Sequence, residues 1–192
     1  MRATTLFWAI VLIGVVPFYA RLPERRFRPD EVFAAWDRTI IRIRAAEWAA
    51  ILVYLATVYV WPWNFPLTPY PRAAPVAGLI LTAGGAFLST WSKVRLGAWF
   101  STTLGVKRDH QLIDTGPYAL ARHPIYTGLA LVLLGGTLVY NRGPALLFLF
   151  LPFCAFFYWQ SVVEERLLVN HFGDAYRRYR ERIGRLLPRI LR

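Results

Sequence analysis

The polar residues that could do chemistry gather in two stretches of the sequence, residues 92–123 and 164–192. All three histidines lie in these stretches, together with the adjacent carboxylates Glu164 and Glu165. The single cysteine and the spacing of the histidines give no metal-ligand pattern. These residue types therefore predict a site that works by binding, orientation and electrostatics, with no metal.

The most informative stretch is residues 115–128, TGPYALARHPIYTG. Gly116 and Pro117 predict a turn, and Pro124 predicts the first turn of a helix. The start of a helix exposes unpaired backbone N–H groups, which favour an anion. Arg122 lies beside this helix start, so the stretch predicts a site for a carboxylate or phosphate. The alternative is that Arg122 reaches the lipid headgroups and Pro124 only starts the helix.

Apolar helices must position these residues. The 192 residues are 56% hydrophobic and 18% charged, whereas soluble domains carry about 25% charged residues. Only residues 141–143 separate the last two apolar segments, which predicts a tight antiparallel helical hairpin. The sequence therefore predicts an all-α integral membrane protein with five transmembrane helices, each near the roughly 17–25 residues that cross a bilayer. The five predicted spans are residues 4–20, 45–63, 74–91, 124–140 and 144–163.

The positive charge predicts the orientation of these spans. The net charge is +12, and residues 21–44, 92–123 and 164–192 contain 20 of the 23 Lys and Arg residues. The positive-inside rule places these three intervals in the cytoplasm, which leaves the N-terminus outside and the C-terminus cytoplasmic. Glu47 is the only acidic residue within the spans, which disfavours a proton-coupled transporter or an ion channel. Long apolar runs also argue against nucleic acid as the partner of the basic residues.

Several motifs in a fixed order resemble a known family. The segment HQLIDTGPYALARHPIYTG is followed by the apolar hairpin and then by EERLLVNHFGDAYRRYRERIGRLLPR. Together they resemble the isoprenylcysteine carboxyl methyltransferase family and, more loosely, the membrane phospholipid N-methyltransferases, over roughly residues 99–188. The resemblance implies S-adenosylmethionine as methyl donor, bound on the cytoplasmic side, and a lipophilic or lipidated acceptor. The length and the predicted spans indicate one domain, 1–192, with three spans in 1–91. The resemblance places the donor-binding half in 92–192.

The resemblance assigns roles to individual residues. Glu164 is expected to close the donor site from the end of the fifth span. The position of Glu165 at the same span end, considered by itself, indicates a solvated neighbour of Glu164. Arg122 is our candidate for electrostatic help in catalysis. The residues expected to bind S-adenosylmethionine are His110, Gln111, Leu112, Ile113, Tyr118, His123, Pro124, Ile125, Tyr126 and Glu164.

Gln160 is expected to face the acceptor substrate. It stands where eukaryotic members of the family have an arginine, four residues before the donor-binding glutamate. A neutral amide attracts a carboxylate less strongly than a guanidinium does. The sequence therefore predicts a neutral or amine-bearing lipophile in preference to a prenylcysteine, unless Arg122 or the start of the fourth span supplies the missing positive charge.

The C-terminal stretch predicts a basic helix with two aromatic residues, Tyr176 and Tyr179, among five arginines. Such a helix either anchors to anionic lipids or covers the bound donor. Two other functions remain open for the whole chain. One is an NADPH-dependent membrane reductase related to the sterol reductases, which usually have more spans and a longer chain. The other is a membrane adaptor without enzymatic activity.

Overall fold

The structure is a computed structural model that describes residues 3–14, 45, 49, 53, 70–100, 111–141 and 150–189. All regular secondary structure among these residues is helical, which confirms the predicted all-α class. Two short 3-10 turns, η2 (Gly97–Trp99) and η3 (Gly116–Ala119), accompany the α-helices. The α-helices are α1 (Ala3–Gly14), α4 (Ala74–Leu96), α5 (Pro124–Val139), α7 (Leu151–Phe172) and α8 (Asp174–Arg182).

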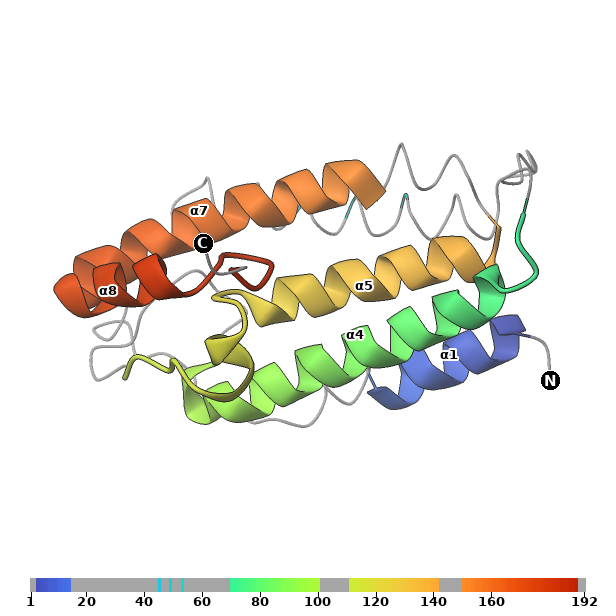
Figure 1. Cartoon of the computed structure of the whole chain (residues 1–192), viewed down its shortest axis with the longest axis horizontal. Helices are drawn as coiled ribbons and strands as arrows, with labels where there is room; N and C mark the ends of the chain where they lie inside the picture. Colours follow the sequence, from blue (N-terminus) through green and yellow to red (C-terminus); the bar gives the residue numbers. More distant parts are fainter. Residues whose placement is uncertain are drawn as a thin grey trace.

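The long helices run roughly alongside one another, with α5 between α4 and α7 and with α1 against α4 (Figure 1). Helix α8 lies at the end where α4 and α7 finish and α5 begins (Figure 1). Gly173 separates α7 from α8 and has a φ of +56°, a left-handed conformation that glycine adopts without steric cost. This glycine allows the chain to turn back, so that α8 packs against the end of α7.

Small residues hold α4 and α5 in close contact. A Cβ atom added at Gly128 of α5 would lie 2.5 Å from the carbonyl oxygen of Gly85 on α4. One added at Gly135 would lie 2.5 Å from the carbonyl oxygen of Gly78, so the close approach repeats along the pair. Close backbone contact through small residues is the usual way in which helices associate in membranes, where apolar side chains gain little by leaving lipid. These contacts thereby fix α5 alongside α4 at two successive positions.

The structure agrees with several predicted helix boundaries. Helix α5 begins at Pro124, as predicted, while α4 extends five residues beyond the predicted end of its span at residue 91. Helix α7 runs nine residues beyond the predicted end of its span at residue 163, through Glu164 and Glu165 to Phe172. Residues 15–20, 142–149 and most of 45–63 lie outside the described residues, and so do the corresponding parts of three predicted spans.

One helix of the described residues, Ala74–Trp99, is long and apolar enough to cross a bilayer, with a mean hydropathy of 1.3. The stretches Ala3–Ile13 and Pro124–Val139 are apolar but shorter. The predicted number of five spans stays a prediction.

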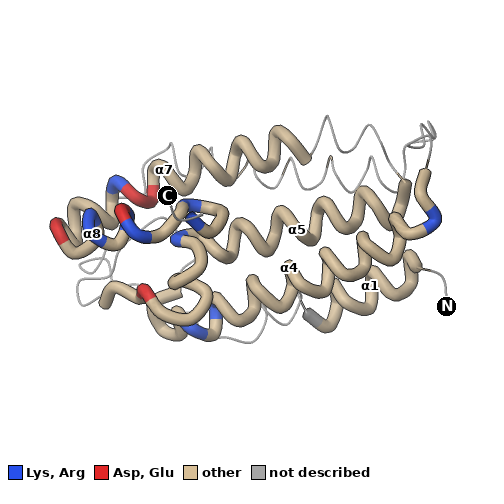
Figure 2. Tube along the Cα trace, in the orientation of Figure 1, with Lys and Arg blue, Asp and Glu red and all other residues tan. Residues whose placement is uncertain are grey.

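Charged residues gather at one end of the helix bundle. Figure 2 shows the Lys, Arg, Asp and Glu positions around the end of α4, the start of α5, the end of α7 and α8. At the opposite end, Arg72 lies just before α4 begins. The bundle therefore has an apolar length and one charged end, and the candidate functional residues belong to the charged end.

Candidate functional site

Glu165 is the centre of a buried ion cluster. Its side chain is 2% exposed, and its Oε1 atom accepts a hydrogen bond from Arg122 Nε at 2.8 Å. Arg185 donates two further hydrogen bonds, Nε to Oε1 at 3.1 Å and Nη2 to Oε2 at 2.8 Å. Burial alone would raise the pKa of Glu165, but its contacts with His123, Arg185 and Arg122 lower the pKa to about 2. Glu165 is therefore ionised, and the expectation that it is a solvated neighbour of Glu164 is wrong.

Arg122 binds the protein's own anion. Besides Glu165, its guanidinium donates hydrogen bonds to the backbone carbonyls of Arg180 and Ile183, and its side chain is 8% exposed. The prediction that Arg122 holds an external carboxylate or phosphate is wrong for this arrangement, because Glu165 already occupies the guanidinium. The alternative that Arg122 reaches lipid headgroups is also wrong, since the side chain is buried. Its predicted catalytic role stays a prediction.

The chain after α8 is tied to the start of α5. The backbone N–H groups of Arg122 and His123 donate to the carbonyls of Gly184 and Arg185, each at 2.9 Å. The hydroxyl of Thr127 donates to the carbonyl of Leu186. This C-terminal strap, residues 183–187, therefore uses backbone groups that precede α5, and it brings Arg185 to Glu165.

Glu164 belongs to a different surface of α7. Its Oε1 accepts a hydrogen bond from the hydroxyl of Tyr126, and its Oε2 lies 3.3 Å from His123 Nδ1. The rings of His123, Tyr126 and Phe157 stack in sequence, with centroid separations of 5.6 and 5.1 Å. The Glu164 side chain is 25% exposed. It is thus an oriented carboxylate that a ligand can still reach.

His123 connects the two glutamates. Its Nε2 atom lies 3.4 Å from Glu165 Oε1 but makes no hydrogen bond, while Nδ1 faces Glu164. Burial alone would lower the pKa of His123, but the contacts with Glu164 and Glu165 outweigh burial and raise the pKa above its ordinary value. The two carboxylates therefore favour a protonated, positively charged His123 at this position.

Gln160 lies one helical turn before Glu164 and is 1% exposed. Its Oε1 atom is buried and has no hydrogen-bond partner. Buried acceptors are almost always hydrogen-bonded in proteins, and an unpaired one costs free energy. An N–H or O–H group of a ligand would satisfy this oxygen, which agrees with the prediction that Gln160 binds a substrate but does not test it.

The other predicted donor-binding residues lie around the same end of the bundle. Tyr118 is buried; its hydroxyl donates to the carbonyl of Ser92, and its own carbonyl accepts the hydroxyl of Tyr179 at 2.7 Å. Pro124 is buried in the first turn of α5, next to the half-buried Ile125.

Gln111 is exposed, whereas Leu112 and Ile113 are half-buried. An ion pair between Asp114 and Arg182, at 3.6 Å, links this strip to α8. Among the described residues, the strip forms no hydrogen bond with Glu164, and His110 lies outside the described residues. The donor-binding roles of all these residues stay predictions.

Two features of the candidate site were not predicted from the sequence. The first is the central position of Glu165, and the second is the contribution of Arg185 from the C-terminal strap. In α8, Tyr176 and Tyr179 are both 2% exposed, so its aromatic side faces the protein and not the lipid. The spacing of the tyrosines among the arginines could have predicted this burial. A basic helix whose aromatic residues share one face can bury that face against the protein.

Comparisons with known proteins identify the family to which the chain is related. The phospholipid methyltransferase family model matches residues 73–175. A protein-S-isoprenylcysteine O-methyltransferase of Schizosaccharomyces pombe is 29% identical over 198 aligned residues, which cover 93% of this chain and 80% of the relative. The protein of the same name from Saccharomyces cerevisiae is 29% identical over 76% of this chain and 63% of its own length.

A solved structure shares the fold. The eukaryotic intramembrane Ras methyltransferase, an isoprenylcysteine carboxyl methyltransferase, aligns with a TM-score of 0.62 at 19% sequence identity. The alignment covers 98% of this chain and 68% of that protein. The matched residues of the family model include η3, all of α5 and the Glu164–Glu165 pair, which are the elements that build the site. The chain belongs to the phospholipid methyltransferase family and is a membrane methyltransferase related to the isoprenylcysteine O-methyltransferases.

Proposed function

We propose that the protein transfers a methyl group from S-adenosylmethionine to the carboxyl group of a lipid-bearing acceptor, of the isoprenylcysteine type, at the cytoplasmic membrane interface. The names of the two curated relatives support this acceptor class, so we place it ahead of the neutral or amine-bearing lipophile that Gln160 alone predicts. The observation on which the proposal depends most is the environment of Glu164. It is a part-exposed carboxylate, oriented by Tyr126 and His123 and followed by a buried ion cluster that fixes its neighbours.

The residues at this surface fit the proposed donor. S-adenosylmethionine carries an ammonium group, a sulfonium and an aromatic base. Glu164 would accept hydrogen bonds from the ammonium or the ribose hydroxyls of the donor. The Tyr126 ring stacks between the rings of His123 and Phe157, which fixes the hydroxyl that orients Glu164. The unpaired Oε1 of Gln160, on the same helix, calls for a ligand donor group. When bound, the donor supplies an activated methyl carbon.

The chain's own residues contribute orientation. Tyr126 and His123 hold Glu164 in place, while Arg122 and Arg185 hold Glu165 beside His123. Fixed placement of two reactants can be worth several kcal/mol of the barrier. We therefore assign Arg122 a positioning role through Glu165, in place of a direct contact with the acceptor.

The apolar helices support a membrane setting for this reaction. With five spans and the basic intervals inside, the charged end of the bundle would face the cytoplasm, where the soluble donor is available. The lipophilic acceptor would approach from the bilayer beside the apolar helices. Long-range attraction between the basic residues and anionic lipids would keep this end at the membrane surface.

Gln160 favours a second acceptor class, an amine-bearing lipid. Its neutral side chain and unpaired oxygen favour a hydrogen-bond donor, such as an amine, over a carboxylate. The family model that matches the chain is that of phospholipid methyltransferases. An amine-bearing lipid is therefore the alternative acceptor, and it would use the same donor site.

The experiment is methyl transfer from labelled S-adenosylmethionine by the protein purified in detergent. A farnesylated cysteine, an amine-bearing phospholipid and a neutral lipid serve as acceptors. We expect labelling of the farnesylated cysteine, and E164Q should abolish most of it, whereas E181Q on the exposed surface of α8 should not. Labelling of the amine lipid alone would replace the first acceptor with the second. Absence of labelling together with tight NADPH binding would overturn methyl transfer and favour a reductase.

A further inference from the structure

Helix α7 has a second surface, on the side away from Glu164 and Gln160. Large side chains are exposed along it, with exposures of 52% for Leu151, 55% for Tyr158 and 44% for Trp159. These residues and Val162 share one side of the helix, because their spacing follows its 3.6-residue period. An apolar stripe therefore runs along α7 towards the charged end of the bundle.

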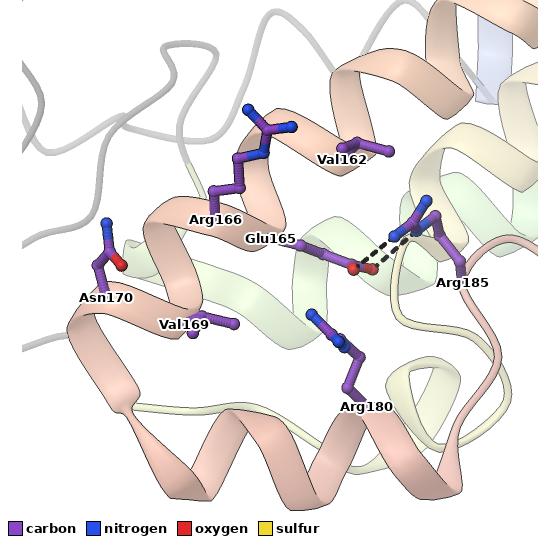
Figure 3. Close-up of a pocket in the computed structure, with 7 residues that line it drawn as sticks. All are labelled: Val162, Glu165, Arg166, Val169, Asn170, Arg180 and Arg185. Atoms are coloured by element: carbon purple, nitrogen blue, oxygen red, sulfur yellow. Dashed lines mark hydrogen bonds and ion pairs between the residues drawn. The ribbon is translucent and has the colours of Figure 1, made fainter.

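The stripe leads into a basic cavity of about 240 Å³ between α7, α8 and the C-terminal strap. Figure 3 shows Arg180 extending from α8 towards the space beside Glu165, while Arg185 from the strap contacts the Glu165 carboxylate. Val162 and Val169 give the cavity apolar walls, and Arg166 and the amide of Asn170 complete its rim. The cavity thus combines three guanidinium groups with an amide and two aliphatic side chains.

The positive charges that line the cavity outnumber its negative charges. Glu165 is its one acidic residue, and that carboxylate is already bound by both Arg122 and Arg185. Arg166 and Arg180 form no ion pair within the described part of the chain. The cavity therefore presents two uncompensated positive charges to whatever enters it.

Tyr158 joins the apolar stripe to the cavity. The guanidinium of Arg185 lies 4.8 Å from the centroid of the Tyr158 ring, a cation–π contact at the boundary between the two surfaces. A ligand with an apolar chain and an anionic head would contact both surfaces at once. A free anion would use the cavity only, and a neutral lipid would use the stripe only.

We propose that this surface is a binding site for an anionic phospholipid, separate from the methyl-transfer site. The phosphate is held by Arg166 and Arg180, whose guanidinium groups donate charge-assisted hydrogen bonds to phosphate oxygens. The acyl chain lies along Leu151 and Tyr158. The proposal does not depend on methyl transfer, because it concerns a different surface of α7 and needs neither donor nor acceptor.

The test measures displacement of a fluorescent phosphatidylglycerol from the full-length protein in detergent. The competitors are phosphatidylglycerol, phosphatidylcholine, inorganic phosphate and a farnesylated cysteine. We expect phosphatidylglycerol to compete at least tenfold better than each of the others. The double variant R166Q/R180Q should weaken binding at least tenfold, because it removes both phosphate ligands.

The matched control is R177Q/R178Q, which removes the same charge from exposed residues of α8 that do not line the cavity. It should bind the fluorescent lipid within about twofold of the parent, and thermal melts should show that both double variants remain folded. Equal losses in the two double variants would overturn the site in favour of general charge attraction. Equal competition by phosphatidylcholine or inorganic phosphate would overturn the assignment of an anionic lipid, and stronger competition by the farnesylated cysteine would reassign the surface to the acceptor.

Discussion

Helix α5 is held by apolar backbone packing along its length and by charged side chains at its start. Along its length, α5 packs against α4 through glycines, and the backbones approach so closely that Gly85 and Gly128 have no room for a Cβ atom. At its start, the same helix is held by charges, since Arg122 and His123 precede Pro124 and face Glu165 and Glu164. Packing fixes the axis of α5, and ion pairs fix the groups at its end.

The residues that hold α5 against α4 therefore differ from the residues that can bind a ligand. The glycine contact between α4 and α5 leaves no room for a larger side chain, and it presents no side chain that could bind a ligand. A buried ion pair costs desolvation, so it is weak evidence for stability, but breaking it leaves a charge without a partner. Substitutions along α5 should therefore affect folding, whereas substitutions at its start should divide between folding and ligand binding.

The largest effect is expected for Gly128→Val. A Cβ there would lie 2.2 Å from Ser89 Oγ and 2.5 Å from the carbonyl oxygen of Gly85, so α4 and α5 must separate. We expect loss of folded protein, measured as the yield of monodisperse protein in detergent. Gly84→Ala is the control, because no atom lies within 4 Å of its added Cβ, and it should keep or slightly raise the thermal stability. A folded G128V with the parent's thermal stability would refute the close contact.

Removal of the Glu165 carboxylate should have the next largest effect. In Glu165→Ala, Arg122 loses its buried anion and Arg185 loses both hydrogen bonds, which should cost about 3–5 kcal/mol of unfolding free energy. Unfolding in mixed micelles measures the loss. Glu181→Ala, at an exposed position of α8, should change stability by less than about 0.5 kcal/mol. Equal stability of the two variants would show that the ion cluster does not hold the strap.

Acid should weaken the same cluster. The pKa of Glu165 is about 2 in the folded protein and 4.5 for an ordinary glutamate, so its contribution is fully present above pH 4.5 and is lost as the pH falls towards 2. The difference corresponds to about 3 kcal/mol. Stability measured between pH 6 and pH 2 should fall more steeply for the parent than for E165Q. Parallel curves would contradict the low pKa.

Tyr126→Phe should have the smallest of these effects. It removes the hydroxyl that donates to Glu164 but keeps the ring that stacks on Phe157. We expect a five- to tenfold loss of S-adenosylmethionine affinity, equivalent to about 1 kcal/mol, with little change in thermal stability. Calorimetric titration measures the affinity. A variant with unchanged affinity would remove Tyr126 from the donor site.

The parts of this organisation that are local in sequence were predictable. Pro124 starts α5 as predicted because a proline fits the first turn of a helix whatever surrounds it. The different environments of Glu164 and Glu165 were not predictable. The two side chains leave the helix in different directions, and the partners of Glu165 lie 43 residues before it and 20 residues after it. Only the turn at Gly173 and the path of the strap bring Arg185 back to this carboxylate.

The central claim is that these adjacent glutamates have different roles: Glu164 binds the methyl donor and Glu165 holds the structure around it. The most direct measurement is calorimetric titration of S-adenosylmethionine into the parent, E164Q and E165Q, together with a thermal melt of each protein. We predict that E164Q loses ten- to a hundredfold in affinity and keeps the parent's melting temperature. We also predict that E165Q has a clearly lower melting temperature. An E164Q variant that binds the donor as tightly as the parent, while folded, would contradict the account.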